Sequence, residues 1–369
     1  MGARFANRLA RAQQAMAEQN LDLLIVNNRE NLIYFTGLTQ IECLAVLIPR
    51  EGEPCAVTLW LDGGYVAQQS GLKTFGYMFP RENLGAKMAD IIRGLGLQRE
   101  RPRFGFERYF VPFAVYETLR DAFPEAAFVN ASDLFYKLRA IKEPGEVELM
   151  RRAARSACAG MAAAIKAVRP GAAELEVLAE AEYAMIKAGS GGSSFRPQVV
   201  SGPRTLLTHP CASEKKIETG EVVVIHLGAT CDGYCAKMCR TVAVGDIPAE
   251  QAAIYRLLVE AQAAAIEALR PGKTADEVDA AARRLIEAAG YGRQFLDVTG
   301  YGVGLRQSEF YPIIGRGRPE AIEAGMVVDL LISSVYRPGV GGPRVTDVIL
   351  VGEEENEILT DFPRTLFQV

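Results

Sequence analysis

Six side chains that can take part in acid–base or nucleophilic chemistry fall in short segments rich in glycine, proline or apolar residues. Imidazole exchanges protons near neutral pH, an ammonium stabilises developing negative charge, and a thiolate is a nucleophile. A phenol donates a hydrogen bond, and a buried carboxyl serves as general acid or base. The six candidates are His209 in LLTHP, His226 in VVVIHLGA, Lys237 and Cys239 in GYCAKMCRT, Tyr301 in TGYGVGL and Glu309 in RQSEF.

Four of these residues also have a structural interpretation. His209 has polar turn residues beside it, which favours proton transfer over packing against the following proline. His226 lies in an apolar strand, as either a hydrogen-bonded core histidine or a substrate-binding group. Lys237 either supplies positive charge to a cleft or extends its ammonium to solvent. Cys239 is either a nucleophile with a pKa depressed by nearby positive charge or a buried filler.

Tyr301 and Glu309 complete the candidate catalytic set. Tyr301 can donate a hydrogen bond to a substrate oxygen. A buried Glu309 could exchange protons, and its alternative role is a salt bridge to Arg306 or Arg344. The residue types therefore indicate proton transfer and stabilisation of negative charge.

Composition argues against several classes of partner. The chain has 369 residues and a formal net charge of -4, with acidic and basic residues interspersed, so we expect no nucleic-acid partner. The N-terminus lacks the apolar core of a secretory signal, and no run of about 18 apolar residues is present to span a membrane.

Seven cysteines scattered through apolar segments indicate reduced thiols and a cytoplasmic protein. Cys231, Cys235 and Cys239 recur every fourth residue, but the glycine and tyrosine between them indicate a hairpin and strand rather than a zinc site.

The pattern of apolar residues divides the chain in two. In residues 1–135, a helix near 4–19 is followed by expected strands at LDLLIVNN, YFTGL, ECLAVLIPR and PCAVTLW, which predicts a small α/β domain. Helical patterns at 146–168 and 173–188, followed by a strand-rich zone at 197–245, open a second domain over 146–369. The chain is long enough for both domains to have full apolar cores.

The second domain contains an internal repeat. AAIKAVRPGAAELEVLAEAEYAMIKAG (163–189) and AAIEALRPGKTADEVDAAARRLIEAAG (264–290) align without a gap, and each reads as helix, RPG turn and helix followed by strands. Such a duplication predicts two pseudo-symmetric halves that close around a shared cleft.

The chain resembles the creatinase/prolidase/methionine aminopeptidase family, the pita-bread hydrolases, over nearly its whole length. The resemblance rests on the order and spacing of five strings: VVSGPRTLLTH (199–209), GEVVVIHLGATCDGYCAKMCRT (220–241), TGYGVGLRQSE (299–309), EAGMVVDLL (323–331) and GGPRVTDVILV (341–351). YKLRAIKEPGEVELMRRAA (136–154) resembles the junction between the two domains of prolidase-like members. The implied fold class is α/β, with a small N-terminal α/β domain and a C-terminal pita-bread domain, a duplicated α+β unit with a pseudo-twofold axis.

The family's metal ligands are the point at which this sequence departs from the pattern. Peptidases of the family hold two metal ions with two Asp, one His and two Glu side chains. At the matching positions this chain has His226, Lys237, Tyr301, Leu331 and Thr346. These residues lack the anionic ligands that hold two ions about 3.5–4 Å apart. We therefore expect no dinuclear metal centre and no cofactor, unless the register is displaced and ligands lie nearby.

The family also has metal-free branches, and the C-terminal line ILTDFPRTLFQV (358–369) resembles the ending of one of them, ectoine hydrolase. Creatinase is the other. This resemblance implies metal-independent hydrolysis of a C–N bond in a small nitrogenous compound such as an amidine, guanidine, lactam or amide. His209 would relay protons, Lys237 and Tyr301 would stabilise the oxyanion, and Cys239 or Glu309 would act as nucleophile or base.

A second set of residues is expected to bind the substrate: Glu42, His226, Arg344 and Thr346. Glu42 stands near the position where the partner subunit of the creatinase branch presents an arginine to the substrate carboxylate, so an acidic group there favours a cationic substrate. The resemblance also implies a homodimer that acts on a small molecule. The alternatives are a lyase acting on a small molecule and a non-catalytic pita-bread domain that binds other proteins.

Overall fold

The computed structural model describes residues 3–41, 44–97 and 100–369, and these form two compact units that divide between Arg139 and Ala140. Helix α6 (Ser132–Ala140) occupies part of the interval between the two domains predicted from the sequence. Within the described residues, no helix has the combination of length and apolar character needed to cross a membrane.

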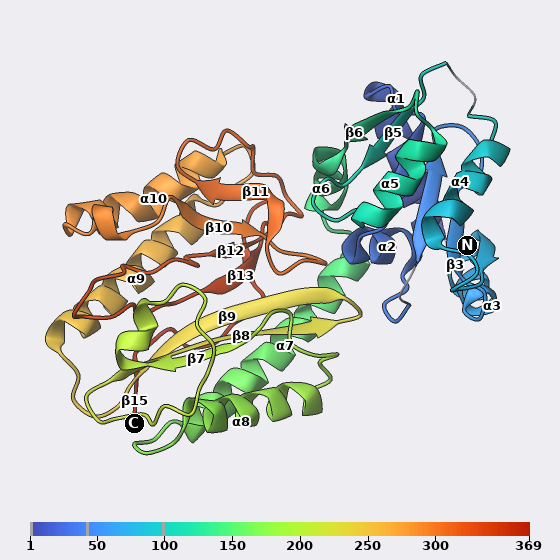
Figure 1. Cartoon of the computed structure of the whole chain (residues 1–369). Coiled ribbons are helices and arrows are strands. Elements are labelled where there is room, and N and C mark those ends of the chain that lie inside the picture. Colours follow the sequence, from blue (N-terminus) through green and yellow to red (C-terminus); the bar gives the residue numbers. More distant parts are fainter. Residues whose placement is uncertain (1–2, 42–43, 98–99) are drawn as a thin grey trace. The chain divides into compact units, whose positions relative to one another are not determined.

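Unit 1, the blue-to-teal part of Figure 1, is built on a six-stranded mixed sheet whose order is β4-β3-β2-β1-β5-β6. Its central strands are apolar and buried, as the sequence pattern predicts, and they pack with helices α4 and α5 in one core. The strands are β1 (Leu23–Val26), β2 (Ala45–Pro49), β3 (Cys55–Leu59), β4 (Lys73–Tyr77), β5 (Arg103–Phe106) and β6 (Ala127–Asn130). The remaining helices are α1 (Ala3–Glu18), α2 (Arg29–Thr36), α3 (Gly63–Ser70), α4 (Leu84–Gly94) and α5 (Phe113–Ala122).

One predicted strand of unit 1 is wrong. YFTGL was expected to be extended because aromatic and β-branched residues favour strands, but its first three residues are the end of helix α2. Gly37 ends that helix in the left-handed conformation, with φ +74°, and its N–H donates to Ile33 O. The glycine is therefore a helix cap rather than a turn between strands.

Unit 2 contains two smaller sheets. The four-stranded sheet has the order β15-β9-β8-β7, and the five-stranded sheet has the order β11-β10-β12-β13-β14. The strands of the first are β7 (Gln198–Ser201), β8 (Val222–Cys231), β9 (Tyr234–Ala243) and β15 (Phe367–Gln368). Those of the second are β10 (Val298–Gly302), β11 (Glu309–Gly315), β12 (Val327–Leu330), β13 (Asp347–Leu350) and β14 (Glu357–Ile358).

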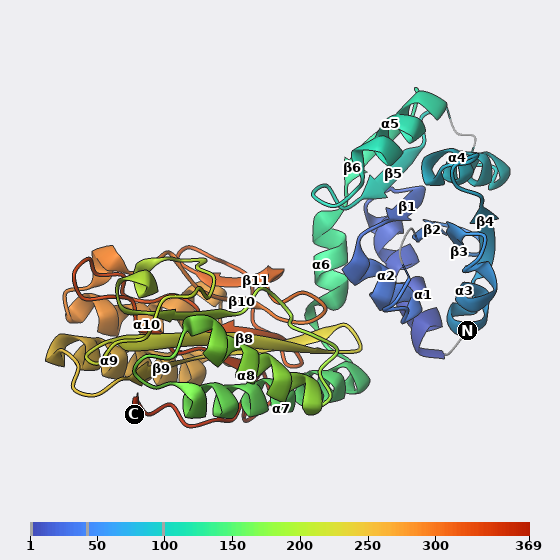
Figure 2. The same cartoon turned by 60° about the horizontal axis from the view of Figure 1, so that its bottom comes forward.

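Each sheet of unit 2 is covered by its own helix pair, as the internal repeat predicts. Helices α7 (Pro144–Ala167) and α8 (Glu174–Lys187) share a core with β7, β8 and β9. Helices α9 (Ala249–Ala268) and α10 (Ala275–Ala288) share a core with the five-stranded sheet. Figure 2 shows α7 and α8 running along one side of β8 and β9. The repeated sequence segments cover the end of the first helix and the whole second helix of each pair.

The hairpin of β8 and β9 is the longest strand pair of unit 2. The two strands are joined by a two-residue turn at Asp232 and Gly233, which have φ +45° and +84°. This Asp-Gly turn matches the twist of an antiparallel pair. All ten residues of β9 are buried, so a polar side chain on this strand must find its partners inside the protein.

Candidate functional site

A row of paired residues crosses the four-stranded sheet of unit 2. Gln198 of β7 lies opposite His226 of β8, and His226 lies opposite Cys239 of β9. A single bridge pairs Cys239 with Thr346, with backbone N–O distances of 3.0 and 3.1 Å. Directly opposed residues project from the same face of a sheet. The residues next to them, such as Ile225, face the core under α7 and α8, so the row lies on the other face.

A cleft of about 830 Å³ opens on this face, within unit 2. Its lining includes four of the residues predicted from the sequence: His209, His226, Tyr301 and Arg344. Four others are not among its lining residues: Lys237, Cys239, Glu309 and Thr346. The predicted substrate-binding residue Glu42 lies outside the described residues.

His226 is a buried imidazole at the cleft, only 7% exposed, with the ring of Phe195 packed on it at a centroid distance of 4.6 Å. The segment before Phe195 crosses β8 closely at Gly228, where a Cβ would lie 2.1 Å from the Ser194 hydroxyl. Within the described part of the chain, His226 Nε2 has no hydrogen-bond partner. Burial, and then the positive charge of Lys237, holds the His226 pKa well below its ordinary value. The imidazole is therefore neutral at neutral pH.

Arg344 is a buried guanidinium whose partners are uncharged. Nη1 donates to Gln198 Oε1 at 3.1 Å, and Nη2 donates to the carbonyls of Thr205, at 3.2 Å, and Leu207. Among the residues that the structure describes, Nε has no hydrogen-bond partner and no carboxylate forms an ion pair with Arg344. A buried positive charge without a counterion favours an anionic group on a ligand.

Lys237 lies behind the cleft wall in an ion pair with Asp329. Nζ is 2.5 Å from Asp329 Oδ2, and both side chains are fully buried. The same ammonium donates to Gln307 Oε1 at 3.0 Å and to Ser308 Oγ at 2.9 Å, and these two residues line the cleft. Burial raises the pKa of Asp329, and the positive charge of Lys237 opposes that rise. The predicted cation is present beside the cleft, but protein acceptors surround its ammonium.

Tyr301 and Glu309 lie at the two ends of the loop that carries Gln307 and Ser308. Tyr301 is half-buried, its backbone N–H donates to Asp329 Oδ1 at 2.6 Å, and burial, followed by the nearby Asp329, raises its pKa. The phenol is therefore protonated at neutral pH and can donate a hydrogen bond into the cleft. Glu309 is 3% exposed, and its Oε1 accepts a hydrogen bond from the backbone N–H of Arg306 at 3.3 Å.

Cys239 and Thr346 are both buried beneath the cleft surface. Burial raises the pKa of the Cys239 thiol to about 12, although Arg344 and Arg240 act in the opposite direction. Of the two alternatives for Cys239, the buried filler is favoured over the nucleophile, because desolvation outweighs the nearby positive charge. The hydroxyl of Thr346 donates to Leu331 O at 3.0 Å, so it is engaged with the backbone.

His209 is exposed at the cleft, between Thr208 and Pro210, which also line it. Its imidazole is the more accessible of the chain's two histidines, because His226 is buried. Its exposure leaves the imidazole in contact with bulk water, and the proton-transfer role of His209 stays a prediction.

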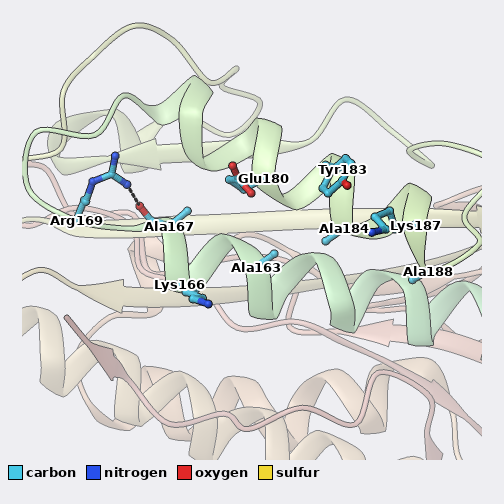
Figure 3. A pocket seen from close by; sticks show the side chains of 9 residues that line it. All are labelled: Ala163, Lys166, Ala167, Arg169, Glu180, Tyr183, Ala184, Lys187 and Ala188. Atoms are coloured by element: carbon cyan, nitrogen blue, oxygen red, sulfur yellow. Dashed lines mark hydrogen bonds between the residues drawn. The ribbon is translucent and has the colours of Figure 1, made fainter.

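A second hollow, of about 680 Å³, lies along helices α7 and α8 (Figure 3). Its lining includes four alanines, with Glu180 and Tyr183 on one helix and Arg169 at its edge, where Nη1 donates to Ala167 O at 3.3 Å. Figure 3 shows these side chains spread along the two helices rather than converging on one point. It contains none of the residues predicted from the sequence, so the cleft is the stronger candidate site.

The side chains at the five family ligand positions do not fit a pair of metal ions. A lysine ammonium repels a divalent cation, and the aliphatic Leu331 has no donor atom to offer one. Within residues 3–41, 44–97 and 100–369, no group of three or more His, Cys, Asp and Glu side chains is placed to hold a metal ion. No displaced ligand set is thus found nearby in this part of the chain.

Sequence reasoning missed Asp329 and Gln307, the two partners that define the setting of Lys237 besides Ser308. Asp329 carried a readable signal, since a charged residue inside the apolar run MVVDLL needs a buried partner. Gln307 carried none, because a glutamine in a loop is ordinarily solvated. Phe195 was missed for a similar reason: nothing in its segment indicates that it crosses β8.

Comparison with known proteins extends over both units. Residues 148–353 match Metallopeptidase family M24, and residues 8–141 match the Creatinase/Prolidase N-terminal domain. The uncharacterized peptidase YqhT of Bacillus subtilis is 31% identical, with 97% of this chain and 99% of that protein covered. The Xaa-Pro dipeptidase of Pyrococcus horikoshii is 30% identical, with 95% and 96% covered. The solved structure of the Xaa-Pro dipeptidase from Bacillus anthracis has a TM-score of 0.90 at 32% identity, with 99% and 100% covered.

These comparisons confirm the predicted fold and correct the predicted function. Metal-independent hydrolysis of a small nitrogenous compound is wrong, because similar proteins matched end to end are named Xaa-Pro dipeptidases. The comparisons likewise do not support the predicted metal-free branch, because the similar proteins are named Xaa-Pro dipeptidases. The loss of metal ligands in this chain carries no information about its substrate. The matched lengths and the shared fold show that the chain belongs to metallopeptidase family M24, with a creatinase/prolidase N-terminal domain.

Proposed function

We propose that this protein acts on short peptides, binding a dipeptide in the cleft of unit 2 and hydrolysing its amide bond. The observation that carries the proposal is the end-to-end similarity to Xaa-Pro dipeptidases of Pyrococcus horikoshii and Bacillus anthracis. The cleft lies in the M24 domain, and its volume of about 830 Å³ is ample for a dipeptide.

The charges of the cleft suit the two ends of a dipeptide, which is a zwitterion at neutral pH. Arg344 is buried without a counterion among the described residues, and Arg196 and Arg306 add positive charge to the wall. These groups favour the free carboxylate of the peptide. Asp297, which also lines the cleft, is an exposed carboxylate that can receive the amino group.

Two side chains are assigned roles in the chemical step. Exposed His209 takes a proton from the water molecule that attacks the amide carbonyl carbon and gives a proton to the nitrogen of the leaving amine. Tyr301 donates a hydrogen bond to the oxygen of the amide carbonyl. Lys237 is assigned an indirect role: it holds Gln307 and Ser308 at the cleft wall through its hydrogen bonds. Cys239 is given no role in bond cleavage, because its buried thiol stays protonated.

The test is a panel of Xaa-Pro and other dipeptides, each beside its C-terminal amide. Free amino acids are measured by mass spectrometry, and binding is measured by calorimetry, with protein as purified, treated with chelator, or supplied with Mn²⁺. We expect the free-acid dipeptides to bind and be cleaved and the amides to bind weakly, because the amides lack the carboxylate. His209→Gln is expected to lower turnover more than binding.

Three outcomes would count against the proposal in different ways. Binding of dipeptides without release of amino acids would overturn the proposed hydrolysis and support only the proposed binding of dipeptides. Equal binding of acids and amides would remove the role of Arg344. An absence of binding across the panel would overturn the substrate class altogether.

We also propose that the protein is a homodimer located in a reducing compartment. The first proposal rests on the family resemblance, together with exposed aromatic residues on unit 1, namely Trp60, Tyr65 and Phe79. Light scattering during gel filtration measures the subunit number directly, and a monomer at working concentration would overturn the homodimer.

The proposal of a reducing compartment rests on the cysteines, since the six in the described part of the chain are all free.

A further inference from the structure

The positions that would hold metal in the family lie close together in this protein, and four of the five groups found there make contacts within the protein. Lys237 of β9 reaches Asp329 of β12, and the backbone N–H of Tyr301 on β10 reaches the same carboxylate. Thr346 is bridged to Cys239 on β9, and its hydroxyl reaches the carbonyl of Leu331. Four of the five positions therefore belong to two bonded groups rather than to a row of free ligands.

The ammonium of Lys237 is surrounded by three protein acceptors. Its Nζ donates hydrogen bonds to Ser308 Oγ at 2.9 Å and Gln307 Oε1 at 3.0 Å, and it lies 2.5 Å from Asp329 Oδ2 as an ion pair. The other carboxylate oxygen accepts the N–H of Tyr301 at 2.6 Å. Both charged side chains are fully buried, so each is the other's counterion.

The pair also links the two halves of unit 2. Lys237 belongs to the four-stranded sheet under α7 and α8, whereas Asp329 belongs to the five-stranded sheet under α9 and α10. A dinuclear metal centre at this place would draw ligands from both sheets and join them through the ions. Here an ammonium and a carboxylate join the sheets at this place, beside the buried Arg240–Asp347 pair and the Cys239–Thr346 bridge.

We infer that the Lys237–Asp329 ion pair takes the place of a metal centre as a cross-link between the two halves, and that this place in the protein takes no divalent cation. The inference does not depend on the substrate, because it concerns what neutralises Asp329 and what holds the halves together. It also accounts for Leu331 and Thr346. On this inference no cation binds at these positions, and the Thr346 hydroxyl instead donates to the backbone carbonyl of Leu331.

The first test uses the unaltered protein and does not measure turnover. Metal content is determined by mass spectrometry, and the thermal unfolding midpoint is recorded with chelator and then with Mn²⁺, Co²⁺ or Zn²⁺. We expect less than stoichiometric metal and a midpoint that neither chelator nor added cation changes. Stoichiometric metal whose removal lowers the midpoint would overturn the inference.

The second test is a double-mutant cycle on the pair, measured as thermal midpoints in chelator. Lys237→Met or Asp329→Leu alone leaves one buried charge unpaired and is expected to lower the midpoint strongly. The double variant removes both charges and should regain much of that loss. If the two single losses add in the double variant, the side chains do not act as a unit and the inference fails.

The matched control is Lys216→Met, which removes an exposed lysine from its ion pair with Glu176. Exposed pairs contribute little, so this variant should keep the midpoint of the unaltered protein. Should either single variant fail to fold, a folded double variant supports the inference, and failure of the double variant as well overturns it. Since none of these readouts involves peptide cleavage, an inactive protein could still confirm the cross-link.

Discussion

Arg240 and Arg344 are both buried arginines of unit 2, but they differ in how fully their donors are used. Arg240 donates to Asp347 Oδ1 at 2.7 Å and to four backbone carbonyls, those of Cys239, Thr346, Phe362 and Pro363. Arg344 lacks a carboxylate partner and a partner for Nε among the described residues.

The difference separates structural from binding groups on the two sides of the sheet. Arg240 follows Cys239 on β9 and so points to the face under α7 and α8, whereas Arg344 lines the cleft on the other face. A polar group that is fully satisfied inside the protein has nothing left to offer a ligand. An incompletely satisfied one beside a cleft does. This contrast leads to four predictions.

The largest effect is expected from Arg240→Met, on stability. Loss of one partner from a buried ion pair leaves Asp347 poorly compensated, which should lower the free energy of unfolding by about 3–5 kcal/mol. Urea unfolding monitored by circular dichroism measures it. Arg364 also contacts Asp347, at 2.7 Å, but is partly exposed, so Arg364→Met should cost less. A larger cost for Arg364 would reverse the assignment.

Arg344→Gln should act on binding more than on stability. A hydrogen bond to a charged group is worth about 1.5–3 kcal/mol, so affinity for a free-acid dipeptide should fall roughly 10- to 100-fold. Its cost in unfolding free energy should be below that of Arg240→Met. Calorimetry on the dipeptide and its C-terminal amide checks the prediction, since the amide should respond little. Equal losses for both ligands would mean that the guanidinium does not meet the carboxylate.

His226 should give stability a pH dependence. Its pKa in the folded protein is well below the ordinary value of 6.5, so below that pH the unfolded chain binds a proton that the folded protein does not. Stability is therefore full above this pH and falls by about 1.4 kcal/mol per pH unit below it, as long as folded His226 stays neutral. His226→Phe should remove this component from urea unfolding curves. The exposed His209, changed to Gln, is the control and should leave the slope intact.

The smallest effect is expected at Cys239. Because burial raises its pKa to about 12, its thiol should resist iodoacetamide in the native protein at neutral pH, and half-buried Cys211 should react first. Peptide mass mapping distinguishes the two, and labelling in urea shows that both can react. Alkylation of native Cys239 ahead of Cys211 would restore it as a candidate nucleophile.

The fold of unit 2 could be predicted because its signals are local. The two matching helix–RPG–helix segments predict the duplication, and the Asp-Gly turn fixes the hairpin of β8 and β9. The exception in unit 1 is YFTGL, where strand-forming residues end a helix. Gly37 ends this helix in the left-handed conformation, and the strand propensity of the residues before it does not reveal that role.

The site was less predictable because its contacts join distant parts of the chain. The loss of metal ligands could be read at Lys237, but its pairing with Asp329, 92 residues away, could not. At Cys239 the sequence left two alternatives open, a nucleophile and a buried filler, because the burial of this residue depends on distant parts of the chain such as Thr346. The predicted substrate failed for a third reason: an altered catalytic group carries no information about the ligand's shape.

The placement of Lys237 and Asp329 on different sheets has a consequence for how this unit can be divided. A fragment ending after β9 would hold a buried ammonium with no counterion, and a fragment beginning at α9 would hold a buried carboxylate with none. Each duplicated half has its own helices and core, yet each half alone would contain a buried charge without its counterion. The two halves should therefore unfold in one cooperative step, and separately produced fragments should gain stable structure only when mixed.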